Sequence, residues 1–336
     1  MSEHAELKKT ISGIGTGLES NTESDASDVD LSVVTTLYQS AEYIAEFCER
    51  VSQAAKQIAG DSYEIVLVND GSPDNSHSIA IAQAEVDPHI VVIDLSRNFG
   101  HHQAIMTGLR QACGRRIFLI DVDLEEPPEC LSELNQVLSN GECDVAYGIQ
   151  TRRKGGFVER NTGALFWSLI RWFSRMEIPA NPLTARLMTK RYVNALLAHN
   201  EREVFLAGLW HITGFVQVPV SIQKSSRGVT TYGLRQRFEL FVNSITSFSN
   251  APLVAIFYVG LLISTFSFVW LVYLVFARVV LGNIVEGWTS VIVSVWLLGG
   301  LMISFIGIVG IYLAKVFSEV KQRPHTIIRD IYKREK

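Results

Sequence analysis

The chain has 336 residues, with 30 Lys and Arg against 34 Asp and Glu, and its formal net charge is −4 at pH 7. This balance excludes the strong basic excess of a protein whose whole surface binds nucleic acid. Apolar residues make up 48% of the chain, and a positive mean hydropathy of +0.19 indicates that they are concentrated in particular segments.

Residues 1–29 are rich in Gly, Ser, Thr and Glu and contain few large apolar side chains. Such a segment cannot bury enough surface to offset the entropy lost on ordering, so we expect a disordered tail. It also lacks the basic start and apolar run of a secretory signal, which predicts that the next domain stays in the cytoplasm. The four cysteines show neither C-x-x-C spacing nor a histidine partner pattern, which fits a reducing compartment.

Short runs of β-branched residues follow, separated by stretches of helical length. The runs begin at Leu31, Glu64, Ile90, Arg116 and Asp144. This alternation predicts βαβ units and a mostly parallel sheet, forming an α/β domain over residues 30–233. Ligands of such sheets bind beyond the carboxyl ends of the strands. The residues that close three of the runs are therefore candidates for a site: 69–72, 96–100 and 121–123.

Asp121 and Asp123 directly follow the apolar run that starts at Arg116 and precede two prolines, which end the strand. Two carboxylates at this spacing can hold Mg²⁺ or Mn²⁺ against a diphosphate, because both ions prefer hard oxygen ligands. A D-x-D sequence also occurs as solvated loop acids or as a helix cap. The D-x-D motif alone therefore does not establish a metal site, and the residues around it must decide.

Two stretches beyond the sheet have an amphipathic pattern. Residues 163–174 are rich in Leu, Phe and Trp, and residues 234–250 carry an apolar stripe beside Arg235 and Arg237. Helices of this kind lie in the lipid headgroup layer, although a helix facing the protein core shows the same stripe.

Two segments near the C-terminus, residues 252–276 and 288–314, contain no charged side chain. Each exceeds the roughly 20 residues that a helix needs to cross the hydrocarbon core, which predicts two transmembrane helices. Their connection is poor in basic residues, whereas residues 316–336 form a basic tail. The positive-inside rule then places both termini in the cytoplasm, as expected of a multi-pass protein of the inner membrane.

The line from Asp94 to Glu129, through Arg97-Asn-Phe-Gly-His-His-Gln and Ile120-Asp-Val-Asp-Leu-Glu-Glu-Pro-Pro-Glu, closely resembles the polyprenyl-phosphate and dolichyl-phosphate sugar transferases of glycosyltransferase family 2. The resemblance extends from Leu31 to Ile328. Four further matches occur in the family's order: Asn69-Asp-Gly-Ser, Lys224-Ser-Ser-Arg-Gly, Ser247-Phe-Ser-Asn-Ala-Pro-Leu and Glu319-Val-Lys-Gln-Arg-Pro.

The resemblance implies a GT-A fold and a sugar phosphoprenol product of inverted configuration. Asp121 and Asp123 would bind the donor sugar and a metal ion, Mg²⁺ or Mn²⁺, and Glu125 stands where the family often has a metal-binding Gln. Asp70 would contact the nucleobase, and Asn98 would belong to the same donor site. The donor would be a nucleotide sugar.

Basic residues would complete the site. Arg227, with Lys224 nearby, occupies the family's mobile basic loop, which would close over the phosphates. Arg160 and one of Arg152 or Arg153 would bind the lipid phosphate, since cations must offset the charge of two phosphate-bearing substrates. Their alternative is a solvated basic loop.

The chain departs from the family pattern at several positions. Thr36-Leu-Tyr-Gln-Ser replaces Pro-x-Tyr-Asn-Glu, and Asn181-Pro-Leu-Thr-Ala-Arg-Leu replaces Asp-Thr-Gly-Asp-Phe-Arg-Leu, without either carboxylate. These changes leave the sugar open. His101 and His102 are interpreted as loop-packing residues, because a base must reach the proton that it removes.

The leading hypothesis is transfer of a hexose or modified hexose from a UDP-linked donor, for example UDP-glucose, to polyprenyl (undecaprenyl) phosphate. Such an acceptor is already anionic, so the reaction needs positioning and charge neutralisation more than a base. A processive polysaccharide synthase would need more membrane helices and a Gln-x-x-Arg-Trp motif, and the sequence has neither. The other alternative is a non-catalytic membrane scaffold. A homo-oligomer is left open.

Overall fold

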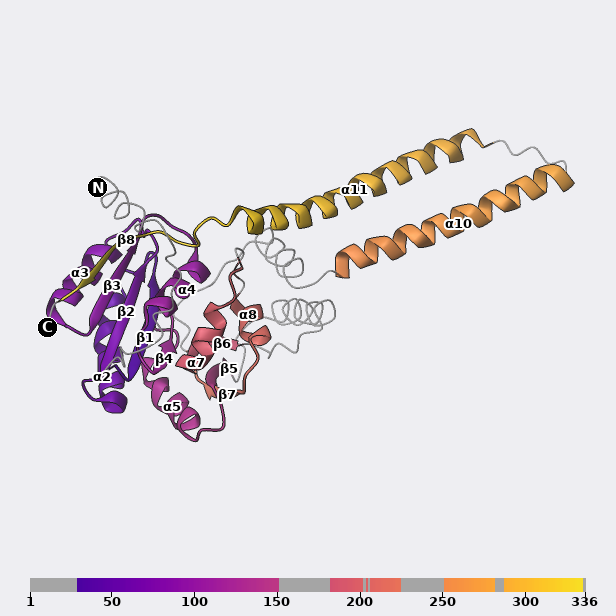
Figure 1. The fold of residues 1–336 in the computed structure, drawn as a ribbon. Helices are drawn as coiled ribbons and strands as arrows, with labels where there is room; N and C mark the ends of the chain where they lie inside the picture. Colours follow the sequence, from indigo (N-terminus) through magenta and orange to yellow (C-terminus); the bar gives the residue numbers. More distant parts are fainter. Residues whose placement is uncertain are drawn as a thin grey trace, which may run out of the picture.

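The structure is a computed structural model, which describes residues 29–150, 182–201, 204, 206–224, 251–281 and 287–334. It consists of an α/β domain and two long helices that extend away from it (Figure 1). The predicted disordered tail, except for its last residue, lies outside the described residues. So do both predicted interfacial stretches.

The described part of the chain contains one sheet and the helices that cover it. The strands are β1 (Leu31–Leu37), β2 (Tyr63–Asn69), β3 (Ile90–Leu95), β4 (Arg116–Leu119), β5 (Val145–Gln150), β6 (Pro182–Thr189), β7 (Gln217–Ile222) and β8 (Ile328–Lys333). The helices are α2 (Ile44–Ala59), α3 (Ser76–Val86), α4 (His101–Gln111), the 3-10 helix η1 (Pro128–Cys130), α5 (Leu131–Ser139), α7 (Lys190–Leu197), α8 (Leu206–Ile212), α10 (Ala251–Leu281) and α11 (Trp288–Lys321).

The strands lie in the order β7-β5-β6-β4-β1-β2-β3-β8. Strands β4, β1, β2 and β3 are parallel, so their carboxyl ends meet at one edge of the sheet. Strand β6 is antiparallel to β4 and β5, and β8 is antiparallel to β3. The predicted mostly parallel α/β sheet is confirmed. The sequence analysis did not predict β8, which lies in the segment interpreted as a basic tail.

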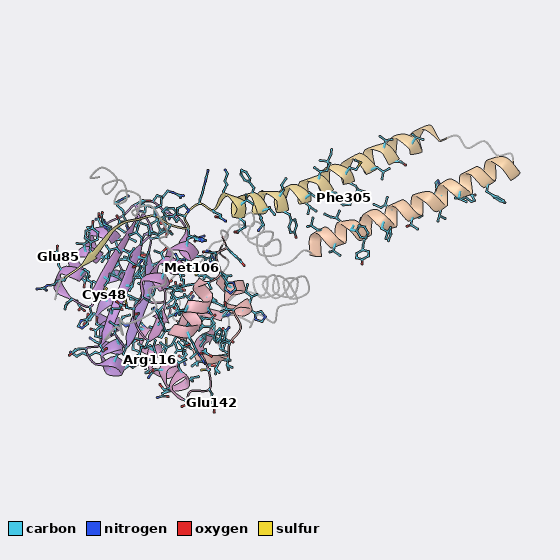
Figure 2. All side chains as sticks on the ribbon, viewed as in Figure 1. Cys48, Glu85, Met106, Arg116, Glu142 and Phe305 are labelled. Carbon is cyan, nitrogen blue, oxygen red and sulfur yellow. The ribbon has the colours of Figure 1, made fainter. Side chains whose placement is uncertain are left out.

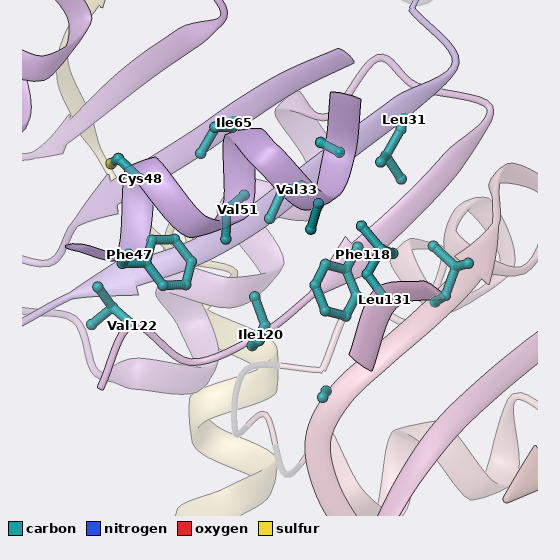
Figure 3. Packing of buried hydrophobic residues seen from close by; sticks show 14 of the residues in the cluster. Leu31, Val33, Phe47, Cys48, Val51, Ile65, Phe118, Ile120, Val122 and Leu131 are labelled. Carbon is teal, nitrogen blue, oxygen red and sulfur yellow. The ribbon is translucent and has the colours of Figure 1, made fainter. Parts of the chain in front are cut away.

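The central strands are buried on both faces, which is why their sequences are rich in β-branched and other apolar residues without a regular polar alternation. Successive residues point to opposite faces, so neighbours in one strand belong to different cores. Val33 packs with Phe47 and Val51 of α2 in the first core (Figure 3). Val34 packs with Ile105 of α4 in the second. Two covered faces hold the sheet rigidly, which fixes the positions of the loops at its carboxyl edge.

Helices α10 and α11 lie beside one another and contain 31 and 34 residues (Figure 1). Many of their described apolar side chains are exposed; Ile303 of α11, for example, is 74% exposed. Figure 2 shows the side chains of α11, with Phe305 labelled, standing away from the α/β domain. Among the described residues, one stretch, Leu298–Lys321, is long and apolar enough to cross a membrane. The chain thus has a candidate membrane anchor.

Candidate active site

The carboxyl edge of the sheet brings several of the predicted residues together. Asp70 directly follows β2, and Asp121 comes two residues after β4. His101, at the start of α4, lies between strand β1 and the D-x-D sequence. Its Nδ1 atom is 2.9 Å from the Thr36 hydroxyl of β1, and its Nε2 atom is 3.6 Å from Asp121 Oδ1. The structure therefore places His101 beside a predicted metal ligand.

The D-x-D sequence is held in a tight turn. Asp123 Oδ1 accepts a hydrogen bond of 2.9 Å from the Glu125 backbone N–H. Leu124, between them, has a φ of +57°, a region that a residue with a branched side chain seldom adopts. Its side chain is buried in the first core, which offsets the unfavourable backbone conformation. Strain of this kind is common where a loop must present its polar groups to a ligand.

The charge of Asp123 is poorly stabilised by the protein alone. Burial raises the pKa of Asp123 above its ordinary value, and the carboxylates of Asp121 and Glu125 raise it further. A divalent cation near these carboxylates would relieve their repulsion, so the donor set is chemically suited to Mg²⁺ or Mn²⁺. Within the described ranges, no three Asp, Glu, His or Cys side chains already converge on a metal position. Phosphate oxygens of a donor would complete the coordination.

Glu125, the predicted third metal ligand, forms an ion pair. Its Oε2 atom is 2.6 Å from Lys224 Nζ, and both side chains are less than one-third exposed. Burial lowers the pKa of Lys224, but the bond to Glu125 raises it, so that the net shift is upward. Lys224 follows β7, and the pair thus brings the start of the predicted basic loop to the D-x-D turn. A phosphate bound beside the D-x-D turn would lie near the Lys224 ammonium group, which could turn from Glu125 to meet it.

Glu126, next to Glu125 in the D-x-D turn, is a candidate site residue that the sequence analysis did not single out. It is 2% exposed, and its two carboxylate oxygens accept backbone N–H groups from Thr184 and Ala185 of β6, at 3.1 and 2.7 Å. Burial raises the pKa of Glu126 to about 7, and the charge of Asp121 adds to the shift. Because Glu125 and Glu126 are adjacent and chemically alike, the sequence does not indicate which of the two side chains is buried. Glu126 ties the D-x-D loop to the segment where the family's usual carboxylates are absent.

Arg186 lies fully buried on the same strand. Its guanidinium group donates to the carbonyls of Thr184 and Leu183, at 3.2 and 3.0 Å, and stacks on the ring of Trp210. Burial lowers the pKa of Arg186 to about 9, while Glu126 and other neighbours raise it. A buried cation therefore stands behind the acidic turn and partly balances its charge.

Asp70 is bonded to the protein's own backbone. Its Oδ1 and Oδ2 atoms accept the N–H groups of Phe99 and Gly100, at 2.7 and 2.9 Å. Burial raises the pKa of Asp70, while these two hydrogen bonds lower it in part. Asp70 thus closes one end of the 96–100 loop, residues Ser96-Arg97-Asn98-Phe99-Gly100. The exposed Asn98, predicted to bind the donor, lies in this loop.

Gly71 lets the 96–100 loop approach the end of β2. Its φ is +59°, and a Cβ atom at this position would come within 2.5 Å of the Arg97 backbone carbonyl carbon. Another side chain here would push the two loops apart. The Asn69-Asp-Gly-Ser match therefore has a local structural reason.

The two histidines differ in their surroundings. His102 Nδ1 is 2.9 Å from the Val204 carbonyl oxygen, and burial lowers the pKa of its imidazole. The loop-packing interpretation suits this side chain. His101 lies instead beside Asp121, as described above. The predicted phosphate-binding residues Arg152, Arg160 and Arg227 lie outside the described residues.

Comparison with known proteins settles the family. The profile of glycosyl transferase family 2 matches residues 32–193. A protein of Mycobacterium tuberculosis classed with the glycosyltransferases is 47% identical over 90% of this chain and 88% of its own length. The chain belongs to glycosyl transferase family 2. The predicted recognition, and the prediction of an enzyme, are confirmed.

Other members of glycosyl transferase family 2 match along nearly their whole length. A prophage-derived bactoprenol glucosyl transferase of Shigella flexneri is 32% identical, over 89% of this chain and 97% of its own length. A prophage bactoprenol glucosyl transferase homologue of Escherichia coli is 32% identical, over 90% of this chain and 99% of its own. The α/β fold of this family 2 glycosyltransferase is GT-A-like, as predicted.

Proposed function

We propose that this glycosyltransferase moves a hexose from a UDP-linked donor, with UDP-glucose the first candidate, to polyprenyl phosphate. The observation that carries the proposal is the match to bactoprenol glucosyl transferases over 89–90% of this chain. The site agrees in its chemistry, because carboxylates and a lysine lie together at the carboxyl edge of the sheet. Such a mixture suits a metal-bound diphosphate.

Roles for the site residues follow from these contacts. Asp121 and Asp123 would hold Mg²⁺ or Mn²⁺, with Glu125 able to join them once its partner Lys224 turns to the donor phosphates. Asp70, through the 96–100 loop that carries Asn98, would shape the nucleotide pocket. The ion, when bound, would neutralise charge on the diphosphate leaving group.

The lipid phosphate needs no base. One of its oxygens attacks the anomeric carbon as the bond from that carbon to the donor's β-phosphate oxygen breaks, and UDP leaves with the electron pair. Inversion at this carbon follows from a single displacement. Arg152, Arg160 and Arg227 would bring the two anionic substrates together, since uncompensated phosphates repel each other. The protein's contribution is positioning and charge neutralisation.

The proposal predicts transfer that depends on both metal and lipid phosphate. Membranes containing the protein, given radiolabelled UDP-glucose and undecaprenyl phosphate, should form a product heavier than the lipid phosphate by one hexosyl residue, that is, a hexose less one water. A chelator should abolish the reaction, and added Mg²⁺ or Mn²⁺ should restore it. Product formation in excess chelator would contradict the metal role, and incorporation of another sugar in a screen of donors would replace glucose.

We also propose that α10 and α11 both cross the membrane. Strand β8 follows α11 yet pairs with β3, so the chain must return to the side on which the catalytic domain lies. If the candidate span Leu298–Lys321 crosses the bilayer, α10 has to cross it as well to bring the chain to the far end of α11. This arrangement agrees with the concentration of basic residues after α11.

Reporter tags test this topology. Tags at residue 1 and after Lys336 should both report cytoplasm, and a tag between the end of α10 and the start of α11, at residues 282–287, should report the opposite side. All three measurements use the full chain in the bacterial inner membrane. Termini on opposite sides would rule out the two-span arrangement.

A further inference from the structure

Arg329 of strand β8 comes after helix α11 in the chain and contacts the carboxyl edge of the sheet, where the donor is proposed to bind. Arg329 Nη1 lies 3.1 Å from Asp94 Oδ2, and its Nη2 atom donates to the Ser96 carbonyl oxygen at 2.7 Å. Asp94 is 1% exposed and is the next-to-last residue of β3. A planar fork can bond two acceptors at once, whereas an ammonium group cannot match both positions.

The local backbone presents Arg329 to these acceptors. In the β3–β8 ladder, Asp94 pairs with Asp330 and Leu95 pairs with Ile328, so Arg329 is the extra residue of a β-bulge. A bulge bends a strand and redirects the side chain at that point. Two further contacts fasten this segment: the Ser96 N–H donates to the Ile327 carbonyl at 2.9 Å, and the hydroxyls of Thr107 and Thr326 are 2.7 Å apart.

The contacts of Arg329 converge on the 96–100 loop. Ser96, its first residue, is held on both backbone groups by the segment containing Arg329. Its last two residues are held by Asp70. Asp94 also accepts a hydrogen bond of 2.7 Å from Asn69 Nδ2, which connects the end of β3 to the end of β2. The loop is thus fixed at both ends, with the exposed Asn98 between them.

We infer that Arg329 is a positioning residue, which holds the 96–100 loop in the conformation that binds the donor nucleotide. Because Arg329 follows α11 in the chain, the same contact joins the membrane anchor to the donor site. Any movement of α11 relative to the domain would reach the loop through residues 322–329. The inference rests on the proposed function for the ligand of the loop, while the contact itself does not depend on it.

Two measurements on the full chain in detergent test this role. Hydrogen exchange of the peptide containing residues 96–100 needs no ligand, and UDP binding with Mg²⁺ reports the donor site. Arg329→Ala should speed exchange of the loop and weaken UDP binding by about tenfold, the scale of a mutation that acts through neighbouring residues. In the transfer assay, the KM for donor should rise, while kcat at saturating donor and the KM for lipid should change little.

Matched variants separate positioning from general stability. Arg334→Ala removes an arginine at the end of β8 that donates to the Glu85 carbonyl, far along the strand from Ser96, and should leave both readouts unchanged. Arg329→Lys should recover part of the UDP affinity, because one of the two acceptors can still be reached.

The outcomes are distinguishable. Faster loop exchange in Arg329→Ala, with no UDP binding even by the unmodified protein, would support the positioning role and refute the proposed donor. Unchanged loop exchange, together with UDP affinity within about twofold of the unmodified protein, would overturn the inference, since a coupled residue should shift binding by more.

Discussion

Asp123→Asn should reduce sugar transfer by on the order of a thousandfold or more, because it removes charge from the acidic turn that holds the metal in the proposed mechanism. The fold should survive the change. An Asn oxygen can still accept the Glu125 N–H, which Asp123 Oδ1 accepts now. The raised pKa of Asp123 also means that its ionised form costs stability at neutral pH, so a neutral side chain should unfold at the same temperature or a higher one.

The pH dependence of stability provides a further check on Asp123. A group with a raised folded-state pKa contributes stability below its unfolded pKa, and that contribution is lost as the pH rises through the folded-state value. Asp123→Asn should remove this decrease in stability with rising pH. Thermal unfolding of both proteins from acidic to neutral pH measures it.

Asp61→Asn is the matched control for Asp123, because Asp61 is an exposed acid whose Oδ1 atom is 3.5 Å from Lys56. It should leave both turnover and melting temperature close to those of the unmodified protein. Turnover by Asp123→Asn above about a tenth of the original rate would remove Asp123 from the metal site, since loss of a charge-stabilising group costs far more. Titration with Mn²⁺ should show weaker binding in this variant alone.

Asp70→Asn should damage both stability and donor use. The two Asp70 oxygens accept two backbone N–H groups, whereas an amide can accept from one and turns its NH₂ group toward the other. Leaving a buried donor unsatisfied costs about 1–3 kcal/mol of unfolding free energy. The 96–100 loop should loosen, and kcat/KM for the donor should fall by about tenfold to a hundredfold, equivalent to roughly 1.4–2.7 kcal/mol.

Equilibrium unfolding and steady-state kinetics measure the two effects of Asp70→Asn. The KM for polyprenyl phosphate should stay close to its original value, because the loop lies at the nucleotide side of the proposed site. Asp61→Asn again serves as the control. If Asp70→Asn lowered stability but left donor kinetics intact, the link between the 96–100 loop and donor binding would be wrong.

Much of the sheet could be predicted from the sequence because its signals are local. The runs that begin at Leu31, Glu64 and Ile90 are apolar on both faces and lie in β1, β2 and β3. Parallel strands share a carboxyl edge, so the polar residues that end these runs had to gather there. The D-x-D turn and Asp70 were found in this way.

The partners within the site were beyond local reasoning. Periodicity assigns Glu125 and Glu126 the same chemistry, yet Glu125 pairs with Lys224 while Glu126 bonds to the backbone of β6. Likewise, nothing in the Asn69-Asp-Gly-Ser match shows that Asp70 accepts hydrogen bonds from Phe99 and Gly100, which come 29 and 30 positions after it in the chain. These choices depend on which strands become neighbours.

The sequence by itself determined the family, the order of the central strands' apolar runs, the acidic turn and the apolar C-terminal segments, because each is written in consecutive residues. The tertiary structure decided that the chain beyond α11 returns as β8 and that Arg329 bonds to Asp94, 235 positions earlier in the chain. No periodic pattern encodes a contact at that separation. The contact forms because the edge of β3 has backbone groups and the buried Asp94 carboxylate, all of which need hydrogen-bond partners. The backbone of β8 pairs with the former, and the Arg329 guanidinium group bonds to the latter.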